Sequence, residues 1–472
     1  MSEKSKTPWT LGELAKASGG KLLCGKPELP IAGLFSDTRK PVKGALFVAL
    51  RGENFDGNRF AHQAVTEHGA AAVLIDRIDG AEGLPLAAGA ILVTDTREGY
   101  LAIAAAHRKE LSSTLWFAIT GSVGKSTTKE MLAHVLKTGG QLNVHKAQGS
   151  FNNTIGLSHT ILGVTAAHQA AVLELGTNHP GEIRPLAAVA RPNIALITCA
   201  AASHLEAFHT IENVAREKAE ILSFQSSTDT AVLNADSPHI AAWRKCARGK
   251  TLSFGLNAPA DMKAKHLRIA DNGCAEFMVR CKDEIVECTL RVPGCHQVTN
   301  ALACLAAAVA SGMRLSAAAQ ALSAFDGVER RFAVRQQQGM TIIDDAYNAN
   351  PASFAAALET LCSMRAQRRF VVAGDMRELG ELSARYHTEL GEKLAACRLS
   401  GLVTVGQSAA ISGTSAVRHG LAADCWTPCA DSVEAAKALR GRLRPGDVVL
   451  VKGSHALHLE KCCEELALVQ SS

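Results

Sequence analysis

The feature that most constrains the fold is an apolar run that leads directly into a short glycine loop. Residues 115–120 read LWFAIT, and residues 121–126 read GSVGKS. Further along, apolar side chains recur at helical spacing at Met131, Leu132, Val135 and Leu136. An apolar run that stops at glycine and is followed by amphipathic periodicity predicts a buried strand, a tight loop and a helix. Such a unit is typical of parallel α/β folds.

The loop has the composition of a phosphate-binding site. The full Walker A pattern carries a further glycine at the position of Ile119, which here belongs to the apolar run, so this loop is shortened. Gly121 and Gly124 permit positive φ and close backbone approach, and the helix presents its positive end to an anion. Lys125 can reach the β- and γ-phosphates of a nucleotide, and the Ser126 hydroxyl can ligate Mg²⁺.

We therefore expect one continuous segment to hold the nucleotide phosphates, made of Gly121, Ser122, Val123, Gly124, Lys125, Ser126 and Thr127. A chance glycine turn before a helix is the alternative. The combination of strand, loop, Lys-Ser pair and amphipathic helix favours nucleotide binding over that alternative.

The rest of the chain continues the alternation of apolar strands and helical patterns. Apolar runs of strand length occur at 45–50, 71–75, 90–93, 170–175, 193–199, 230–234, 340–343, 369–373, 402–405 and 448–451. Strands that are apolar throughout indicate a parallel sheet covered on both faces. Residues 271–292 alternate instead, which predicts an antiparallel meander beside the main sheet. The predicted class is α/β, with a central, mostly parallel P-loop-type sheet and a smaller Rossmann-like C-terminal domain.

Length and pattern together predict three domains. The chain has 472 residues, and at roughly 150 residues per domain this length suits about three. The predicted boundaries are 1–112, 113–327 and 328–472. The polar stretch Arg108–Ser113 is expected to link the first domain to the second.

Composition argues against several classes of function. There are 50 Lys and Arg against 45 Asp and Glu, a net charge of +5, without the like-charge runs of a nucleic-acid-binding chain. The N-terminus lacks the apolar core of a secretory signal, and the longest near-apolar stretch, 301–313, is too short to cross a bilayer. We expect a cytoplasmic protein without membrane insertion. Without a signal peptide, the cysteines are expected to be reduced thiols. The spacing of seven at Cys274, Cys281, Cys288 and Cys295 does not suit a zinc site.

Two polar residues stand at the ends of apolar runs that follow the loop. Glu174 sits near the carboxyl end of the otherwise apolar run AAVLEL (170–175), and His204 comes shortly after the run that ends near Cys199. Ligands of open α/β sheets bind at the carboxyl ends of the strands, so Glu174 is the leading carboxylate for a metal ion. The alternatives are a solvated strand cap for Glu174 and an ordinary surface side chain for His204.

Several motifs together resemble the Mur ligase family. They are TGSVGKSTTKE (120–130), VLELGTNHPGEI (172–183), AAASHLEAF (200–208), AREKAEIL (215–222), PGCHQVTNALA (293–303), DDAYNANPAS (344–353), AGDMRELG (373–380) and VKGSHA (451–456). The resemblance covers nearly the whole chain. It implies an ATP-dependent ligase that forms an amide bond through an acyl phosphate, in the synthesis of peptidoglycan precursors. The implied substrates are ATP, UDP-N-acetylmuramoyl-tripeptide and D-alanyl-D-alanine.

The resemblance also implies roles for residues around the nucleotide. Two magnesium ions would be held by Ser126, Glu174 and His204, and Lys218 would be carbamylated to an anionic group that supports a cation. The alternative for Lys218 is a helix lysine paired with Glu217 or Glu220. The implied nucleotide contacts are His296 and Asn300 on the adenine side, either Arg330 or Arg331, and Asp345 and Tyr347. The family often has arginine after VKGS where this chain has His455, so an anion-pairing role is not expected there.

Substrate contacts are implied in all three predicted domains. The candidates for the uridine diphosphate end are Ser36, Asp37, Thr38, Arg39 and the turn Gly52–Gly57. The candidates for the muramoyl-peptide channel are Asn152, Asn153, Asn178 and His179, and Asp375 is the candidate for the incoming dipeptide. Plain surface loops and structural turns are the alternatives at each of these positions.

Three functional interpretations remain open from the sequence. The first is the ligase described above, which we expect to be a monomer. The second is a sibling Mur ligase or a folylpolyglutamate-type ligase, with the same chemistry and another acceptor. The third is a P-loop motor or switch, which the absence of the first Walker A glycine disfavours. The third residue of the tripeptide, meso-diaminopimelate or lysine, stays open.

Overall fold

The computed structural model describes residues 9–52 and 55–467, and in it the chain divides into two compact units. The first unit contains the residues up to Leu115, His145–Leu173 and Ala188–Arg191. The second contains Trp116–Val144, Glu174–Ala187 and Pro192–Ser472. The predicted three-domain boundaries stay a prediction. Among the described residues, no helix has both the length and the apolar character needed to span a bilayer.

The first unit is built on a five-stranded sheet in the order β2-β9-β8-β5-β4. Its strands are β2 (Lys21–Cys24), β4 (Leu34–Phe35), β5 (Leu46–Val48), β8 (Ala72–Ile75) and β9 (Gly89–Leu92). All pair in parallel except β2 with β9. The helices of this unit are α1 (Leu11–Ser18), α2 (Ala61–Thr66), α3 (Thr96–Glu110) and α5 (Thr154–Leu162), and the strands β11 (Val144–Lys146) and β12 (Ala170–Glu174) lie mainly in it.

One sequence prediction in this unit is wrong. Arg108–Glu110 belong to the last turn of α3 and not to a linker. Basic side chains suit this place, because the C-terminal end of a helix carries partial negative charge. Arg108 also donates from its Nε to the Ala190 carbonyl at 3.1 Å, which holds the turn in position.

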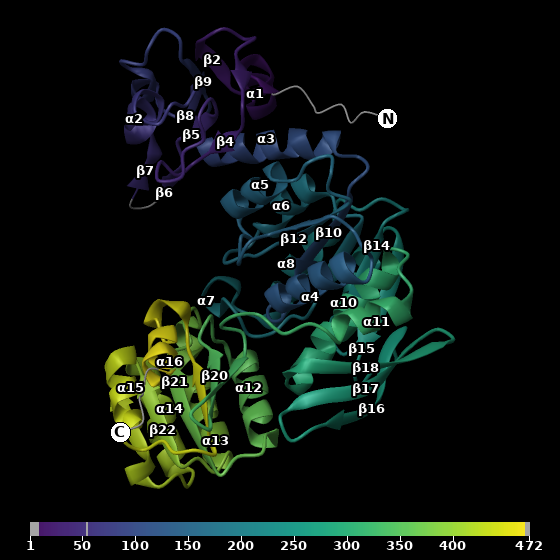
Figure 1. Ribbon diagram of the computed structural model, residues 1–472, viewed down its shortest axis with the longest axis vertical. Helices are drawn as coiled ribbons and strands as arrows, with labels where there is room; N and C mark the ends of the chain where they lie inside the picture. The colour runs from purple at the N-terminus through teal and green to yellow at the C-terminus, as the bar shows by residue number, and fades with distance from the viewer. Residues whose placement is uncertain (1–8, 53–54, 468–472) are drawn as a thin grey trace. The chain divides into compact units, whose positions relative to one another are not determined.

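The second unit contains most of the central sheet, whose strands there run in the order β10-β13-β14-β15-β16-β17-β18. They are β10 (Leu115–Thr120), β13 (Ile194–Ile197), β14 (Thr230–Asn234), β15 (Lys250–Gly255), β16 (Met262–Ile269), β17 (Cys274–Cys281) and β18 (Glu284–Pro293). Pairing is parallel from β10 to β16 and antiparallel from β16 to β18. The meander predicted near 271–292 therefore continues the main sheet instead of lying beside it (Figure 1).

Helices lie in most of the connections between the parallel strands of the central sheet, as is usual for parallel crossovers, and two more follow β18. They are α4 (Lys125–Thr138), α6 (Ile183–Ala190), α7 (Leu205–Phe208), α8 (Ile211–Ala219), α9 (Ile240–Cys246), α10 (Cys295–Ala310) and α11 (Leu315–Leu322). The helix α10 is apolar nearly all round, and most of its residues are buried. It packs against α4 and β15, so the residues at its start lie close to the glycine loop.

The second sheet of this unit has six strands in the order β19-β20-β24-β21-β22-β23. Its strands are β19 (Ala333–Gln337), β20 (Met340–Asp345), β21 (Arg368–Gly374), β22 (Gly401–Val405), β23 (Trp426–Cys429) and β24 (Asp447–Lys452). Only β19 is antiparallel to its neighbour. Its helices are α12 (Pro351–Ser363), α13 (Ser383–Ala396), α14 (Gln407–Arg418), α15 (Ser432–Arg440) and α16 (Glu460–Ala467). The predicted α/β class, with a mostly parallel central sheet and a smaller C-terminal one, is confirmed.

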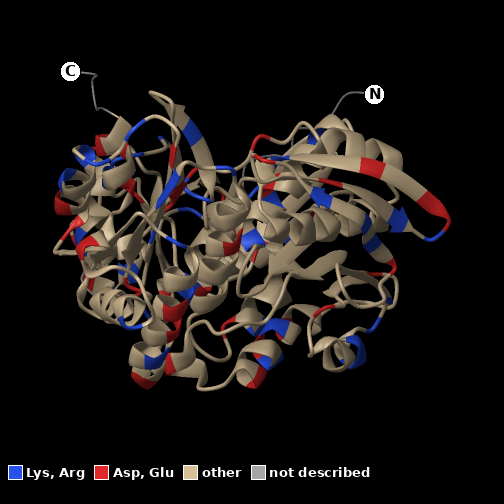
Figure 2. Cartoon of the chain, turned by 90° about the horizontal axis from the view of Figure 1, so that it is seen from below, with Lys and Arg blue, Asp and Glu red and all other residues tan. Residues whose placement is uncertain are grey.

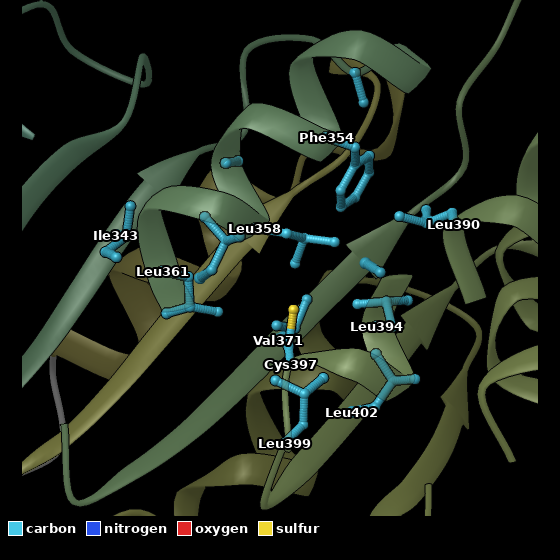
Figure 3. Close-up of a cluster of buried hydrophobic side chains, with 14 of the residues drawn as sticks. Ile343, Phe354, Leu358, Leu361, Val371, Leu390, Leu394, Cys397, Leu399 and Leu402 are labelled. Atoms are coloured by element: carbon cyan, nitrogen blue, oxygen red, sulfur yellow. The ribbon is translucent and has the colours of Figure 1, made fainter. Parts of the chain in front are cut away.

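The helix α12 shows how the local sequence builds this layer. Pro351 occupies its first turn, and Asn350 caps it by accepting the Ser353 N–H at 2.8 Å, which agrees with the predicted start. Phe354, Leu358 and Leu361 then fall on one face and are buried against the sheet. Figure 3 shows these side chains in one cluster with Val371 of β21 and Leu394 of α13.

Charged residues of both signs are interspersed along the described chain (Figure 2). This distribution agrees with the small net charge of +5. Few charged side chains are buried among the described residues. They include Lys129, Glu174 and Lys218 of the central region and Asp344, Asp447, Lys452 and Glu460 of the C-terminal region.

Candidate active site

The glycine loop between β10 and α4 has a backbone that only glycine accommodates. Gly121 has φ 144° and Gly124 has φ 85°. A Cβ atom on Gly121 would lie 1.9 Å from Thr198 Oγ1, and one on Gly124 would lie 2.3 Å from Asn300 Oδ1. Both predicted glycine requirements are therefore confirmed, and Ile119 is fully buried in β10 as expected. The loop directs the start of α4 toward any anion held there.

Lys125 opens α4 and folds back over the loop. Its Nζ donates to the Gly121 carbonyl at 2.7 Å. Burial lowers the pKa of Lys125, while the carboxylate of Glu174 opposes that shift. An anionic phosphate would compete well for this ammonium group, because charge-assisted hydrogen bonds are stronger than bonds to a neutral carbonyl.

Ser126 and Glu174 are brought together as the sequence predicted. Ser126 Oγ donates to Glu174 Oε2 at 2.8 Å, and the Glu174 side chain is almost completely buried at the carboxyl end of β12. Lys129, which sequence reasoning missed, is fully buried with its Nζ 3.8 Å from the same Glu174 oxygen and 3.2 Å from Glu130 Oε1. Its position one helical turn after Lys125 was the available signal.

The donor set at Ser126 and Glu174 fits Mg²⁺. This ion is usually held by one or two carboxylates together with waters and substrate phosphates, and not by a complete protein cage. Among the described residues, no group of three or more His, Cys, Asp and Glu is arranged to hold a metal ion by itself.

The segment before His204 is hydrogen-bonded to the glycine loop. Ser122 Oγ donates to the Ala201 carbonyl at 3.1 Å, and Ser203 Oγ donates to Ser122 Oγ at 2.9 Å. Thr198 Oγ1 donates to the Val123 carbonyl at 2.6 Å. These bonds fix the end of β13 beside the loop, so the residue that follows Ser203 is held close to it.

His204 precedes α7 with the left-handed backbone angles φ 52° and ψ 34°. Its Nδ1 lies 2.5 Å from Glu378 Oε2. The contact is close but not aligned as a straight hydrogen bond. Glu378 belongs to the GDMRELG motif, and its contact with His204 could not be anticipated from the sequence.

Lys218 is buried at the end of α8. Burial, followed by the positive charge of Lys125, lowers the pKa of Lys218 to about 7. The two carboxylates considered as partners have other hydrogen-bond partners. Glu217 accepts the N–H groups of Gly181 and Ile183 at 2.8 and 2.7 Å, and Glu220 Oε2 lies 2.8 Å from Arg184 Nη1.

Asn178 and His179 lie in a loop fixed by carboxylates. Glu182 Oε2 accepts the Asn178 N–H at 2.8 Å and the His179 N–H at 3.2 Å. Both side chains stay exposed, so they are available to a ligand. The role of Glu182 and Glu217 in holding this loop was missed, because an acidic residue gives no sequence signal for accepting hydrogen bonds from loop backbone.

The structure distinguishes the two candidate arginines. Arg331 Nη2 lies 3.0 Å from Ser126 Oγ, and its guanidinium sits 3.9 Å from the ring centroid of Tyr347. Arg330 Nη1 instead lies 3.6 Å from Glu460 Oε1. Arg331 is therefore the one placed at the glycine loop.

Asp345 and Tyr347 lie next to these arginines. Asp345 Oδ2 accepts from Lys452 Nζ at 2.6 Å, and its Oδ1 accepts the Phe332 N–H at 3.1 Å. Lys452, in the motif VKGSHA, is buried and was missed as a partner. The ring of His455 stacks on Tyr347 with a centroid distance of 5.6 Å and an interplanar angle of 17°.

His296 and Asn300 stand at the start of α10, as expected. Asn300 lies against Gly124 and receives a hydrogen bond from Thr128 Oγ1 at 3.5 Å. His296 lines a cavity of about 500 Å³, together with Asn257, His266, Thr299 and Glu359. Burial lowers the pKa of His296 to about 4, so its imidazole is neutral at physiological pH.

The predicted substrate residues of the first unit lie in local turns. Arg39 donates from its Nε and Nη2 to the two carboxylate oxygens of Asp37, both at 2.9 Å, which lowers the pKa of Asp37 to about 2. Asn153 accepts the Gly156 N–H at 2.9 Å and so caps α5. The turn Gly52–Gly57 includes residues 53–54, which lie outside the described residues. Roles in substrate binding stay predictions here.

Asp375, the candidate for dipeptide binding, accepts a hydrogen bond from the backbone of a neighbouring helix. Its Oδ1 accepts the Ala409 N–H at 2.7 Å at the start of α14. Gly406 has φ 107°, and a Cβ there would lie 2.4 Å from Asp375 Oδ2. These contacts hold Asp375 at the start of α14, and its role in binding the dipeptide stays a prediction.

Three family models match successive parts of the chain. The model described as Mur ligase family, catalytic domain, matches residues 30–111. The Mur ligase middle domain matches residues 119–308, and the model described as Mur ligase, glutamate ligase domain, matches residues 330–455.

The chain is also similar to curated proteins and solved structures over nearly its full length. It is 34% identical to the UDP-N-acetylmuramoyl-tripeptide--D-alanyl-D-alanine ligase of Escherichia coli, covering 97% of this chain and 98% of that one. A crystal structure of MurF from Acinetobacter baumannii has a TM-score of 0.88 at 29% identity, covering 98% and 99%. MurF from Thermotoga maritima in complex with ADP has a TM-score of 0.79 at 29% identity, covering 92% and 97%.

Proposed function

The chain belongs to the Mur ligase family, and we propose that it joins D-alanyl-D-alanine to the C-terminal carboxylate of a UDP-N-acetylmuramoyl-tripeptide, with conversion of ATP to ADP and phosphate. The proposal is supported by the relatives named above, which carry this activity in their names and match the chain from end to end. ATP and the nucleotide-linked precursor are cytoplasmic compounds, and the reaction is assigned to that compartment. We expect the active form to be a monomer.

The observation that carries the proposal is the cluster of Lys125, Ser126 and Glu174 behind the glycine loop. The loop amides and Lys125 suit the phosphates of ATP, and the Ser126–Glu174 pair at 2.8 Å suits the magnesium ion that accompanies them. Arg331 adds a positive charge from the C-terminal sheet, 3.0 Å from Ser126 Oγ. This arrangement concentrates positive charge where two anions, the tripeptide carboxylate and ATP, must approach each other.

The proposed reaction has two steps. A carboxylate oxygen of the tripeptide attacks the γ-phosphorus of ATP, and the bond between that phosphorus and the β–γ bridging oxygen breaks, which leaves an acyl phosphate and ADP. The amine of D-alanyl-D-alanine then attacks the acyl carbon, the bond to the phosphate oxygen breaks, and the amine loses its proton. The products are an amide and inorganic phosphate. Lys125 and Arg331 would stabilise the charge that develops on the transferred phosphoryl group.

Magnesium and a modified lysine complete the proposed site. Ser126, Glu174 and His204 would hold Mg²⁺, which neutralises phosphate charge when bound. Lys218 would be carbamylated, and its environment supports this role because a pKa of about 7 leaves much of the amine neutral and able to add CO₂. Brief treatment with a methylating reagent would trap the carbamate. Mass spectrometry of the treated protein should then find the modification on Lys218. Labelling at Lys218 that is unchanged after removal of CO₂ would contradict it.

The adenine base of ATP and the UDP-N-acetylmuramoyl-tripeptide have candidate positions. The cavity beside His296 would hold the purine ring, which its volume of about 500 Å³ supports. Asn178 and His179 would contact the muramoyl peptide, and the exposure of both side chains supports this. Ser36–Arg39 would contact the uridine diphosphate.

Release of phosphate tests the function. We expect ADP and phosphate to form only when ATP, UDP-N-acetylmuramoyl-tripeptide and D-alanyl-D-alanine are all present, and K125A to lower the rate by at least about 100-fold. Phosphate release with ATP alone would favour a motor or switch. Single amino acids that replace the dipeptide without loss of rate would identify a sibling ligase or a folylpolyglutamate-type ligase. Tripeptides with meso-diaminopimelate or lysine at the third position should be compared in the same assay.

A further inference from the structure

We propose that Glu378 is a positioning residue for His204: it holds the imidazole by Nδ1 and so presents the other ring nitrogen, Nε2, to the magnesium ion. This inference rests on the proposed function, in which His204 is a metal ligand. Metal-binding histidines commonly donate their second ring N–H to a carboxylate, which fixes both the tautomer and the direction of the ring.

The contact between the two side chains is the first observation. His204 Nδ1 lies 2.5 Å from Glu378 Oε2, and the His204 ring nitrogen is buried. A small rotation of the imidazole would align the N–H with the carboxylate. With its proton on Nδ1, the ring leaves the Nε2 lone pair for a cation, which is the neutral form that metals bind.

The backbone around the pair is the second observation. Both residues have left-handed angles, with φ 52° at His204 and φ 63° at Glu378. Such conformations are unfavourable for a non-glycine residue, and they persist where the surroundings hold them. Here they aim two side chains that are far apart in sequence at each other.

The packing around α7 is the third observation. The Glu206 N–H donates to the Glu378 carbonyl at 3.3 Å, so backbone and side chain of Glu378 both contact the His204–Glu206 segment. Leu382 and Tyr386 pack on the apolar cluster of Ala202, Leu205, Phe208 and Val214. Gly380 lies against Glu206, where a Cβ would approach its Cα to 3.2 Å. The segment that carries Glu378 is therefore docked on α7 by several independent contacts.

A consequence is that metal affinity depends on this docking. Glu378 belongs to the C-terminal sheet region, whereas Ser126 and Glu174 belong to the central one. If the 378–386 segment separates from α7, His204 loses its orienting carboxylate and the ion loses a directed ligand. Through Glu378, the affinity for the ion therefore depends on whether this C-terminal segment is docked on α7.

Manganese binding to the full-length protein tests the role, with Mn²⁺ as the probe, in the presence of ADP and followed by electron paramagnetic resonance. We expect E378A to raise the Kd for Mn²⁺ by about 10- to 100-fold, the usual effect of removing an orienting partner, and E378Q to raise it less because the amide oxygen still accepts. E381Q is the matched control, an exposed carboxylate in the same segment, and should bind Mn²⁺ like the unaltered protein. Thermal melting of each variant confirms that it is folded.

The tautomer of His204 gives a readout that loss of packing alone would not move. Long-range ¹H–¹⁵N correlation spectra of the metal-free protein should show the proton of His204 on Nδ1, and E378A should shift it toward Nε2. The variant H204A distinguishes the positioning role of Glu378 from the role of His204 as a metal ligand. Weak Mn²⁺ binding in H204A with ordinary binding in E378A would overturn the role of Glu378 and leave the ligase function intact. Ordinary binding in H204A would remove His204 from the metal site and overturn the inference, while the phosphate-release assay reports separately on the ligase reaction.

Discussion

Arg331 and Ser126 are separated by 205 positions in the sequence, yet Arg331 Nη2 lies 3.0 Å from Ser126 Oγ. The Tyr347 ring, 3.9 Å from the guanidinium carbon of Arg331, supports that side chain from the C-terminal sheet. The phosphate loop and the C-terminal region therefore share a polar contact at the point where the proposed phosphoryl transfer takes place.

Replacing this arginine should impair the use of ATP. We expect R331A to lower kcat/KM for ATP by about 10- to 100-fold, because a hydrogen bond to a charged group contributes roughly 1.5–3 kcal/mol. R330A is the matched control and should change the same ratio by less than about 3-fold, since Arg330 lies beside Glu460. Steady-state kinetics with ATP varied will measure both. Equal losses in the two variants would contradict the assignment of Arg331.

Adding one methyl group to the phosphate loop should damage both stability and binding. Gly124 and Gly312 have φ 85° and 93°, but a Cβ on Gly124 would lie 2.3 Å from Asn300 Oδ1 and one on Gly312 would have nothing within 4 Å. We expect G312A to cost about 1 kcal/mol of unfolding free energy from backbone strain alone, and G124A about 2–4 kcal/mol from strain plus overpacking. Urea unfolding and calorimetric titration with ADP would test this. A G124A protein that binds ADP normally would refute the steric argument.

Acid should destabilise the fold partly through His296. Its pKa is about 4 when folded, against about 6.5 for an unfolded histidine, so between these values the unfolded chain binds more protons. The stability associated with the neutral ring is complete above pH 6.5 and is lost as the pH falls toward 4, by about 2 kcal/mol between pH 7 and 5. H296Q cannot titrate there and should show a shallower decline in unfolding free energy over this range. Parallel curves for the two proteins would exclude the effect.

Breaking the buried pair of Lys452 and Asp345 should be costly. Their side chains are 2% and 14% exposed, with Nζ and Oδ2 2.6 Å apart. We expect K452M to lose about 3–5 kcal/mol of unfolding free energy, because it leaves a carboxylate largely buried without its partner. R385A, which removes the exposed pair of Arg385 and Glu389, should lose less than about 1 kcal/mol. Chemical denaturation compares the two, and similar small losses would show that the buried pair is not important for stability.

Local patterns could be predicted from the sequence where neighbours along the chain determine the structure. The glycine loop, the strand that ends at Glu174 and the start of α12 at Pro351 each follow from a few consecutive residues. The misassigned turn Arg108–Glu110 shows the limit of composition, because a polar run at the end of a helix resembles a linker.

Contacts between distant segments could not be predicted in this way. Periodicity treats Arg330 and Arg331 alike, and only the positive φ of 58° at Arg330 and the fold of the C-terminal sheet separate them. Glu378 and Lys452 stood in motifs whose partners lie in other strands and helices. Their roles depend on which distant segments of the chain meet in space, and no local sequence pattern contains that information.

The carboxylate of Asp345 has a consequence for heat sensitivity. One of its oxygens holds Lys452 at the end of β24, and the other holds the backbone of Phe332, the residue next to Arg331. If heating broke the contacts of this carboxylate, Arg331 would lose its position at the glycine loop before the sheet unfolds. Substitutions that remove this carboxylate should therefore displace Arg331 even where the altered protein is still folded.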